Sequence, residues 1–150
     1  MFAPNQERAA QELLRVCRPG GKIGLANWTP DGFTGTYFLA IIQYVPPPPG
    51  LTPPILWGTE ERLRELFGES VASLQITRRS VVARYRSVQH WLEIFRTYFG
   101  PTLKAFEVLD AAGQENLARD LVSVVLRFNR SGDETIVIPS DYLEVVATKR

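Results

Sequence analysis

Residues 12–28 read ELLRVCRPGGKIGLANW, and this stretch decides the fold of the chain. Its first part has the apolar spacing of a helix, and the Pro-Gly-Gly at 19–21 ends that helix because a proline cannot continue it. The residues that follow are nearly continuously apolar around Ile23 and Leu25. Such a run is typical of a strand that is covered on both faces in a parallel α/β sheet. We therefore predict a helix, a turn and a buried strand at residues 22–28.

The helix before this break begins near Asn5, whose side-chain oxygen can accept an otherwise unpaired backbone N–H as an N-cap. Its apolar stripe includes Ala9, Leu13 and Cys17 at i, i+4 spacing. Cys17 is the only cysteine of the chain, which excludes an intramolecular disulfide and a cysteine-based zinc site. On the apolar face of a helix, a free cysteine behaves as a small hydrophobe.

After the strand, the sequence predicts a helix at about residues 34–44, followed by four prolines at 46–49. The proline run cannot continue the helix and favours an extended, polyproline-type path. In other settings such runs bind profilin, SH3 or WW domains. Inside a compact domain they stiffen a loop, and we favour the loop.

Further elements alternate between helix and strand. A threonine caps a helix at residues 59–68, which a glycine ends, and residues 72–86 alternate as a long strand. At the carboxyl end, residues 136–138 and 142–148 are both rich in β-formers, and we expect Pro139 to split them.

A helical region separates these strands. Ser87 opens a helix with Trp91 and Phe95 on its apolar face, together with Ile94, Tyr98 and Phe99. A Gly-Pro pair at 100–101 ends it. A shorter helix follows, and a third is expected to begin near Gln114.

Composition gives no sign of a nucleic-acid or membrane partner. The chain has 150 residues, of which 45% are hydrophobic and 22% charged, and its formal net charge is +1. This balance provides no electrostatic attraction to nucleic acid or to anionic lipid. A local basic run contains Arg78, Arg79, Arg84 and Arg86. Arginines spaced along a strand usually keep an exposed face solvated, and we prefer that interpretation over phosphate binding.

The location of the protein is inferred from what the sequence lacks. Its longest apolar run, residues 37–45, is far shorter than the roughly 20 residues that span a bilayer. The amino terminus has no basic region followed by an apolar core, as a secretory signal would. We therefore expect a cytoplasmic protein.

No motif in the sequence predicts a catalytic or metal-binding residue. His90 is the only histidine, and it lacks the partners of a zinc-binding helix, so we expect it to pack or to face solvent. The sequence has neither a nucleophile elbow nor a P-loop. The glycines at 20–21 end a helix before a strand, whereas a phosphate-binding loop opens a helix after one.

The motif LLRVCRPGGKIGLANW resembles the segment between the fourth and fifth strands of class I S-adenosylmethionine-dependent methyltransferases. On this resemblance, residues 22–28 look like the fifth strand and residues 72–86 like the sixth. Residues 142–148, in the ending DYLEVVATKR, look like the antiparallel seventh strand that inserts between them. The resemblance implies an α/β fold with a partial Rossmann-like sheet, a single domain over residues 1–150, and a helical insertion at about 87–130.

The resemblance also implies where a cofactor would lie. In this family S-adenosylmethionine sits over the carboxyl ends of the first, second and fourth strands, as is general for open α/β sheets. The glycine-rich loop and the acidic residue that hold it have no counterpart here. Phe2, Ala3 and Pro4 look like the remnant of the loop after the fourth strand, and they are the candidate cofactor neighbours. We therefore expect that this chain alone does not bind the cofactor.

The same resemblance places an acceptor pocket at the end of strand 22–28. Asn27 and Trp28 would face the methyl acceptor. An aromatic wall or lid would come from Phe33, Tyr37 and Trp57. The alternative for each aromatic residue is packing in the core.

Three interpretations follow. The chain is a methyltransferase-like protein of small-molecule type that is truncated and inactive alone. Alternatively, it is a non-catalytic interaction module that dimerises, or complements a separate cofactor-binding half, through the open edge of strand 22–28. In the third interpretation Met1 is an internal methionine, and a D-x-G-x-G-x-G segment is encoded upstream.

Overall fold

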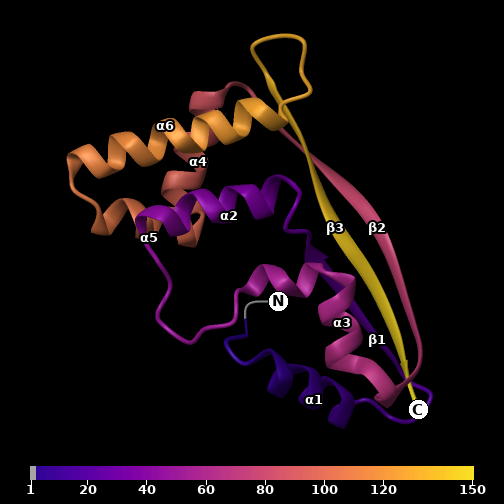
Figure 1. The fold of residues 1–150 in the computed structure, drawn as a ribbon. Coiled ribbons are helices and arrows are strands. Elements are labelled where there is room, and N and C mark those ends of the chain that lie inside the picture. Colours follow the sequence, from indigo (N-terminus) through magenta and orange to yellow (C-terminus); the bar gives the residue numbers. More distant parts are fainter. Residues whose placement is uncertain (1–2) are drawn as a thin grey trace. The chain divides into compact units, whose positions relative to one another are not determined.

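Three strands form one sheet in the order β1–β3–β2, in the computed structural model, which describes residues 3–150 (Figure 1). They are β1 (Lys22–Trp28), β2 (Val71–Tyr85) and β3 (Ile136–Lys149). The strand β3 runs antiparallel to β1, in a register that begins with Lys22 opposite Thr148. The expectation that the last strand inserts between the other two is confirmed.

The described residues divide into two compact units. Unit 1 consists of residues 3–32, 48–80 and 141–150, and unit 2 consists of residues 33–47 and 81–140. The region expected as a helical insertion therefore falls in unit 2, together with the helix that follows β1. Each unit has its own hydrophobic core.

Local signals explain where the helices of unit 1 begin and end. These helices are α1 (Gln6–Val16), the short 3-10 helices η1 (Pro54–Gly58) and η2 (Gly68–Ser70), and α3 (Glu60–Phe67). The Asn5 side chain accepts the Arg8 N–H at 2.8 Å, as expected of an N-cap. Gly20 ends the turn after α1 with a φ of 72°, which glycine adopts at little cost.

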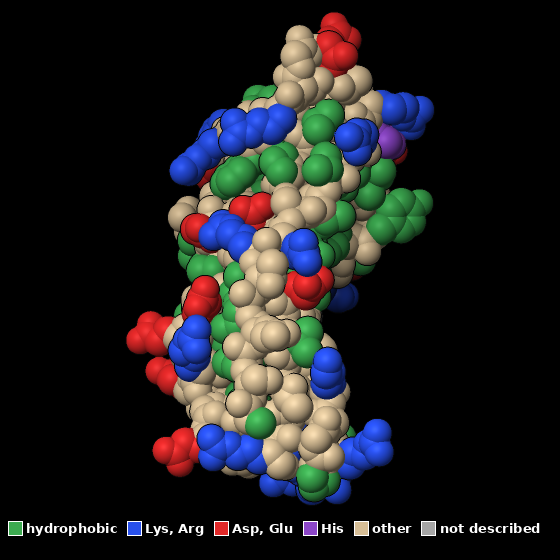
Figure 2. Space-filling model, turned by 90° about the vertical axis from the view of Figure 1, so that its right-hand side faces the viewer, with side chains coloured by type: hydrophobic (Ala, Val, Ile, Leu, Met, Phe, Trp, Pro, Cys, Tyr) green, Lys and Arg blue, Asp and Glu red, His purple; other side chains and the backbone are tan. Residues whose placement is uncertain are grey.

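One face of the sheet in unit 1 packs on these helices, and the other does not. Ile23 and Asn27 of β1 are buried, whereas Lys22, Gly24 and Ala26 are exposed. The prediction that this strand is covered on both faces is therefore wrong. Its continuous apolar appearance comes from a glycine and an alanine, which add little apolar area to the open face. In the lower half of Figure 2 this side shows mainly backbone and polar side chains, with scattered hydrophobic ones.

A buried glutamine joins the helices of unit 1. Gln6 is fully buried, and its Nε2 donates to the Pro53 carbonyl at 3.0 Å. The Arg62 Nε donates to Gln6 Oε1 at 2.9 Å, and the same guanidinium pairs with Glu7 and Glu65. A buried amide costs little when it is hydrogen-bonded in this way. This network fixes α1 against α3 and the segment that leads into η1.

Unit 2 is built around an aromatic core. Its helices are α2 (Phe33–Tyr44), α4 (Val88–Tyr98), α5 (Gly100–Val108) and α6 (Ala111–Phe128). α2 and α6 lie side by side (Figure 1). Trp91 and Phe95 of α4 stack with their ring centroids 4.4 Å apart. Tyr98, which we expected on the same apolar face, is 81% exposed, whereas Phe99 packs against the core.

Two predicted boundaries differ from the structure. The helix expected near Gln114 begins at Ala111, because the Asp110 carboxylate caps it by accepting the Gly113 N–H at 2.8 Å. Pro139 does not split the carboxyl-terminal strand, which is continuous as β3. The pairing of β3 with β1 ends at Tyr142, so Pro139 lies where β3 has no β1 neighbour and a missing N–H is tolerated.

Among the helices of residues 3–150, none is long and apolar enough to cross a membrane.

The closest backbone approach in unit 1 gives a stability prediction. A Cβ on Gly58 would lie 1.7 Å from the Trp28 carbonyl oxygen, whereas a Cβ on Gly24 would meet nothing within 4 Å. Gly58→Ala should therefore push η1 away from β1 and lower the free energy of unfolding by about 1–3 kcal/mol, the usual cost of overpacking. Gly24→Ala, in the same unit, should change it by less than about 0.5 kcal/mol. Urea unfolding of both variants measures the difference. Equal stabilities would contradict the contact between η1 and β1.

Candidate functional site

Three of the five predicted acceptor-site residues lie at the carboxyl end of β1 or in η1 beside it, all in unit 1. Asn27 is 2% exposed and Trp57 is 3% exposed, while Trp28 is half-buried. The Trp28 ring meets the Tyr142 ring edge-on with their centroids 6.1 Å apart. The close approach of Gly58 to the Trp28 carbonyl brings η1, and with it Trp57, to the end of the strand.

Two side chains at this end are buried hydrogen-bond donors. The Asn27 Nδ2 and the Trp57 Nε1 lie below the surface, and neither has an acceptor among residues 3–150. Nearly all buried polar groups in proteins are paired, so an unpaired one requires an explanation. Both groups are donors, and the chemistry that they offer is therefore donation to an oxygen.

An ion-pair network fixes the turn that follows these residues. The Arg78 Nη2 lies 2.9 Å from the Asp31 Oδ2 and 2.9 Å from the Asp141 Oδ2. The Thr29 N–H donates to the Asp141 carbonyl at 3.1 Å, which ties the end of β1 to β3. Hydrogen bonding by Thr29 and then by Arg78 holds the pKa of the Asp31 carboxyl below its usual value, although desolvation opposes the shift. The network is structural, because each carboxylate already has a cationic partner.

The candidate cofactor neighbours lie before α1 in the sequence. Phe2 lies outside the described residues, Ala3 is half-buried and Pro4 is exposed, immediately before the cap of α1. Gly32 follows β1, but a Cβ there would meet the Thr29 Oγ1 at 2.9 Å, so the chain's own turn explains this glycine. Residues 3–150 also contain no group of three His, Cys, Asp or Glu side chains that could hold a metal ion.

The other two predicted acceptor residues lie in the core of unit 2. Phe33 and Tyr37 stack with their ring centroids 6.0 Å apart, and both contact Trp91 edge-on. The Tyr37 hydroxyl shares a buried hydrogen bond with the Thr102 hydroxyl, and burial raises the pKa of Tyr37 well above its usual value. Core packing, the alternative that the sequence left open, accounts for both residues.

Sequence reasoning did not predict a pocket in unit 2. The residues that line it include Arg84, Arg86 and His90. The sequence signals were present, as an arginine run and a lone histidine, but they lie on different elements. Nothing in the spacing showed that they meet.

Curated proteins that resemble the chain come from mycobacteria. Rv1405c of Mycobacterium tuberculosis and Mb1440c of Mycobacterium bovis are each 36% identical over 154 residues, which is 100% of this chain and 55% of the relative. Rv1403c of Mycobacterium tuberculosis is 39% identical over 108 residues, which is 71% of this chain and 39% of the relative. Each is described as an uncharacterised protein. The chain thus spans about half the length of the curated relatives it matches, and no family model matches it.

The Asp31 network predicts a pH-dependent stability. Because the folded-state pKa of Asp31 lies below the ordinary 3.8, its ionised form stabilises the fold above that pH, and this contribution is lost as the pH falls through the folded-state pKa. Asp31→Asn should therefore be less stable than the native chain at pH 7, and the difference should shrink below pH 3.8. Urea unfolding across this range measures it.

Glu115→Gln is the matched control, because Glu115 is exposed on α6 and makes no ion pair within residues 3–150. A gap between native and Asp31→Asn chains that stays constant down to pH 2 would contradict the assignment.

Proposed function

We propose that this chain is the carboxyl-terminal part of an S-adenosylmethionine-dependent methyltransferase fold that acts on a small molecule, and that it is not catalytic alone. The observation that carries the proposal is the strand order β1–β3–β2, with the last strand of the chain inserted antiparallel between the other two. The chain also has a helix, a Pro-Gly-Gly turn and a strand, which resemble the segment that leads into the fifth strand of that family.

The length of the relatives supports the same proposal. The match covers all of this chain but only 55% of the length of each relative. Each relative therefore contains further sequence of comparable length. A cofactor-binding part of the sheet would need sequence of that order. In the proposal, the residues that hold S-adenosylmethionine belong to such a part, and this chain contributes the side that receives the acceptor molecule.

The end of β1 suits an acceptor site. Asn27 and Trp57 offer buried donors, and Trp28 offers an aromatic face against Tyr142. Methyl transfer requires that the two reactants be held in line, so orientation supplies much of the rate. The carboxylates described at this end, Asp31 and Asp141, are paired with Arg78, and the proposal needs neither of them as a base. The acceptor would carry an oxygen that accepts from the Asn27 and Trp57 donors.

The proposal predicts that the purified 150-residue chain does not bind its cofactor. Isothermal titration of the chain with S-adenosylmethionine should give no heat beyond dilution at micromolar concentrations. S-adenosylhomocysteine, which lacks the methyl group, serves as the second ligand and should behave in the same way. Micromolar binding of either compound would contradict the proposed division between cofactor and acceptor parts.

The alternative function, an interaction module, rests on the free edge of β1. Within residues 3–150, β1 pairs with β3 only, so its other edge carries backbone groups without a strand partner. Open strand edges favour pairing with another chain. That chain would be a second copy or a separate cofactor-binding half.

An open edge predicts that the chain does not remain a simple monomer. Sedimentation velocity at micromolar concentration should show dimers or larger species, with a fraction that rises with concentration. Ala26→Pro, which removes a backbone donor from β1, is the test variant. Gly24→Ala is the control, because it lies on the same strand and its added Cβ meets nothing within 4 Å. Ala9→Pro would be unsuitable because it breaks α1. A single species of 16.9 kDa at all concentrations would contradict the open-edge interpretation.

A further inference from the structure

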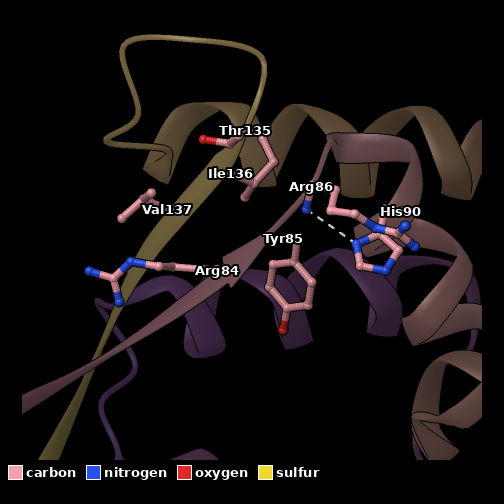
Figure 3. Close-up of a pocket in the computed structure, with 7 residues that line it drawn as sticks. All are labelled: Arg84, Tyr85, Arg86, His90, Thr135, Ile136 and Val137. Atoms are coloured by element: carbon pink, nitrogen blue, oxygen red, sulfur yellow. Dashed lines mark hydrogen bonds between the residues drawn. The ribbon is translucent and has the colours of Figure 1, made fainter.

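Unit 2 contains a shallow pocket that the proposed methyltransferase site does not use. Its volume is about 320 Å³, at the small end of the range for ligand sites. It is lined by residues from the end of β2, the segment that opens α4, and the start of β3 (Figure 3): Arg84, Tyr85, Arg86, His90, Thr135, Ile136 and Val137.

The floor of the pocket is apolar. Ile136 is almost fully buried, and it lies in the core of unit 2. The Tyr85 ring is held by two edge-on contacts, with the Phe95 ring and with the His90 ring, each at a centroid distance of 6.2 Å. These contacts make Tyr85 a fixed aromatic wall against which a planar apolar group can pack.

The rim of the pocket carries two arginines without an acidic partner. Arg78 and Arg79, earlier in the same strand, pair with carboxylates of unit 1. Within residues 3–150, Arg84 and Arg86 make no ion pair, and both are exposed. In Figure 3, Arg84 lies on the side of Val137 and Arg86 on the side of His90.

His90 adds a third donor. Its Nδ1 accepts the backbone N–H of Arg86 at 3.2 Å. In the neutral ring the proton therefore sits on Nε2, which is free to donate. Three acidic residues lie near the pocket lining along the chain. Asp133 is bound by the hydroxyls of Ser131 and Thr135 in its own turn, and Glu93 and Glu134 are exposed and do not line the pocket. The polar groups offered by Arg84, Arg86 and His90 are thus all donors.

We propose that this pocket binds a small organic carboxylate with a flat apolar body. The body packs on Tyr85 and Ile136. The carboxylate accepts from the Arg86 guanidinium and the His90 Nε2–H, because the planar fork of an arginine matches the two oxygens of a carboxylate. Arg84 adds positive charge at the other end of the pocket.

Benzoate is the probe, because it is the simplest flat carboxylate of this kind. His90 is the only histidine of the chain, so its ring resonances report on the pocket without overlap in NMR spectra. Benzoate should shift these resonances saturably at millimolar concentration. Benzamide has the same shape without the charge, and it should bind about tenfold more weakly or not at all. Inorganic phosphate, which has no apolar body, should also bind more weakly.

Variants separate the pocket from a general effect of charge. Arg86→Gln should weaken benzoate binding by about tenfold, the usual cost of losing a charge-assisted hydrogen bond. Arg84→Gln should weaken it by a smaller factor. Arg119→Gln removes the same charge from α6 of the same unit, where Arg119 contacts Asn116, and it should leave binding unchanged. All three positions are exposed, and circular dichroism verifies that the variants fold.

Three results would overturn the proposal. One is that benzoate causes no saturable shift of the His90 ring resonances. Another is equal binding of benzoate and benzamide, or of benzoate and phosphate. The third is an Arg86→Gln variant that binds benzoate as tightly as Arg119→Gln does.

Discussion

The antiparallel pairing of β1 with β3 is the interaction on which the rest of unit 1 depends. It joins the turn after α1 to the end of β3, where the Gly20 N–H donates to the Lys149 carbonyl and the Lys149 N–H donates to the Gly21 carbonyl. At the other end of the pairing, Thr29 bonds to Asp141, 112 positions away in the sequence. Because the central strand β3 follows both of its neighbours in the sequence, the sheet cannot form until β3 is present. Such long-range pairing slows folding.

This constraint also sets where chemistry can occur. The pairing fixes β1, η1 crosses its end at Gly58, and the buried donors of Asn27 and Trp57 are thereby held in place. The same pairing leaves one edge and one face of β1 open. Within residues 3–150, β1 therefore has one strand neighbour, β3. The pocket in unit 2 is independent of both, since its residues and the core beneath it belong to that unit.

The sequence predicted most of what is local. The caps at Asn5, Thr59 and Ser87 were predicted because each depends on one side chain and a backbone N–H three residues away. The burial of β1 was predicted wrongly, because Gly24 and Ala26 look apolar in a sequence but need no cover. Of the five candidate acceptor residues, Asn27, Trp28 and Trp57 lie in unit 1, whereas Phe33 and Tyr37 pack in the core of unit 2, and the role of the first three in an acceptor site stays a prediction. The pocket at His90 was missed, because its residues come from three elements and no spacing links them.

Amide hydrogen exchange, followed residue by residue by NMR, tests the central role of β3 most directly. The central strand of a sheet has hydrogen-bonded neighbours on both sides, so its amides open only when the unit unfolds. We expect the amides of the buried residues Leu143, Val145 and Ala147 to exchange slowest in unit 1, at the rate set by global unfolding. If these amides exchanged as fast as those at the exposed ends of β1, the strand order β1–β3–β2 would be contradicted, and with it the basis of the proposed fold lineage.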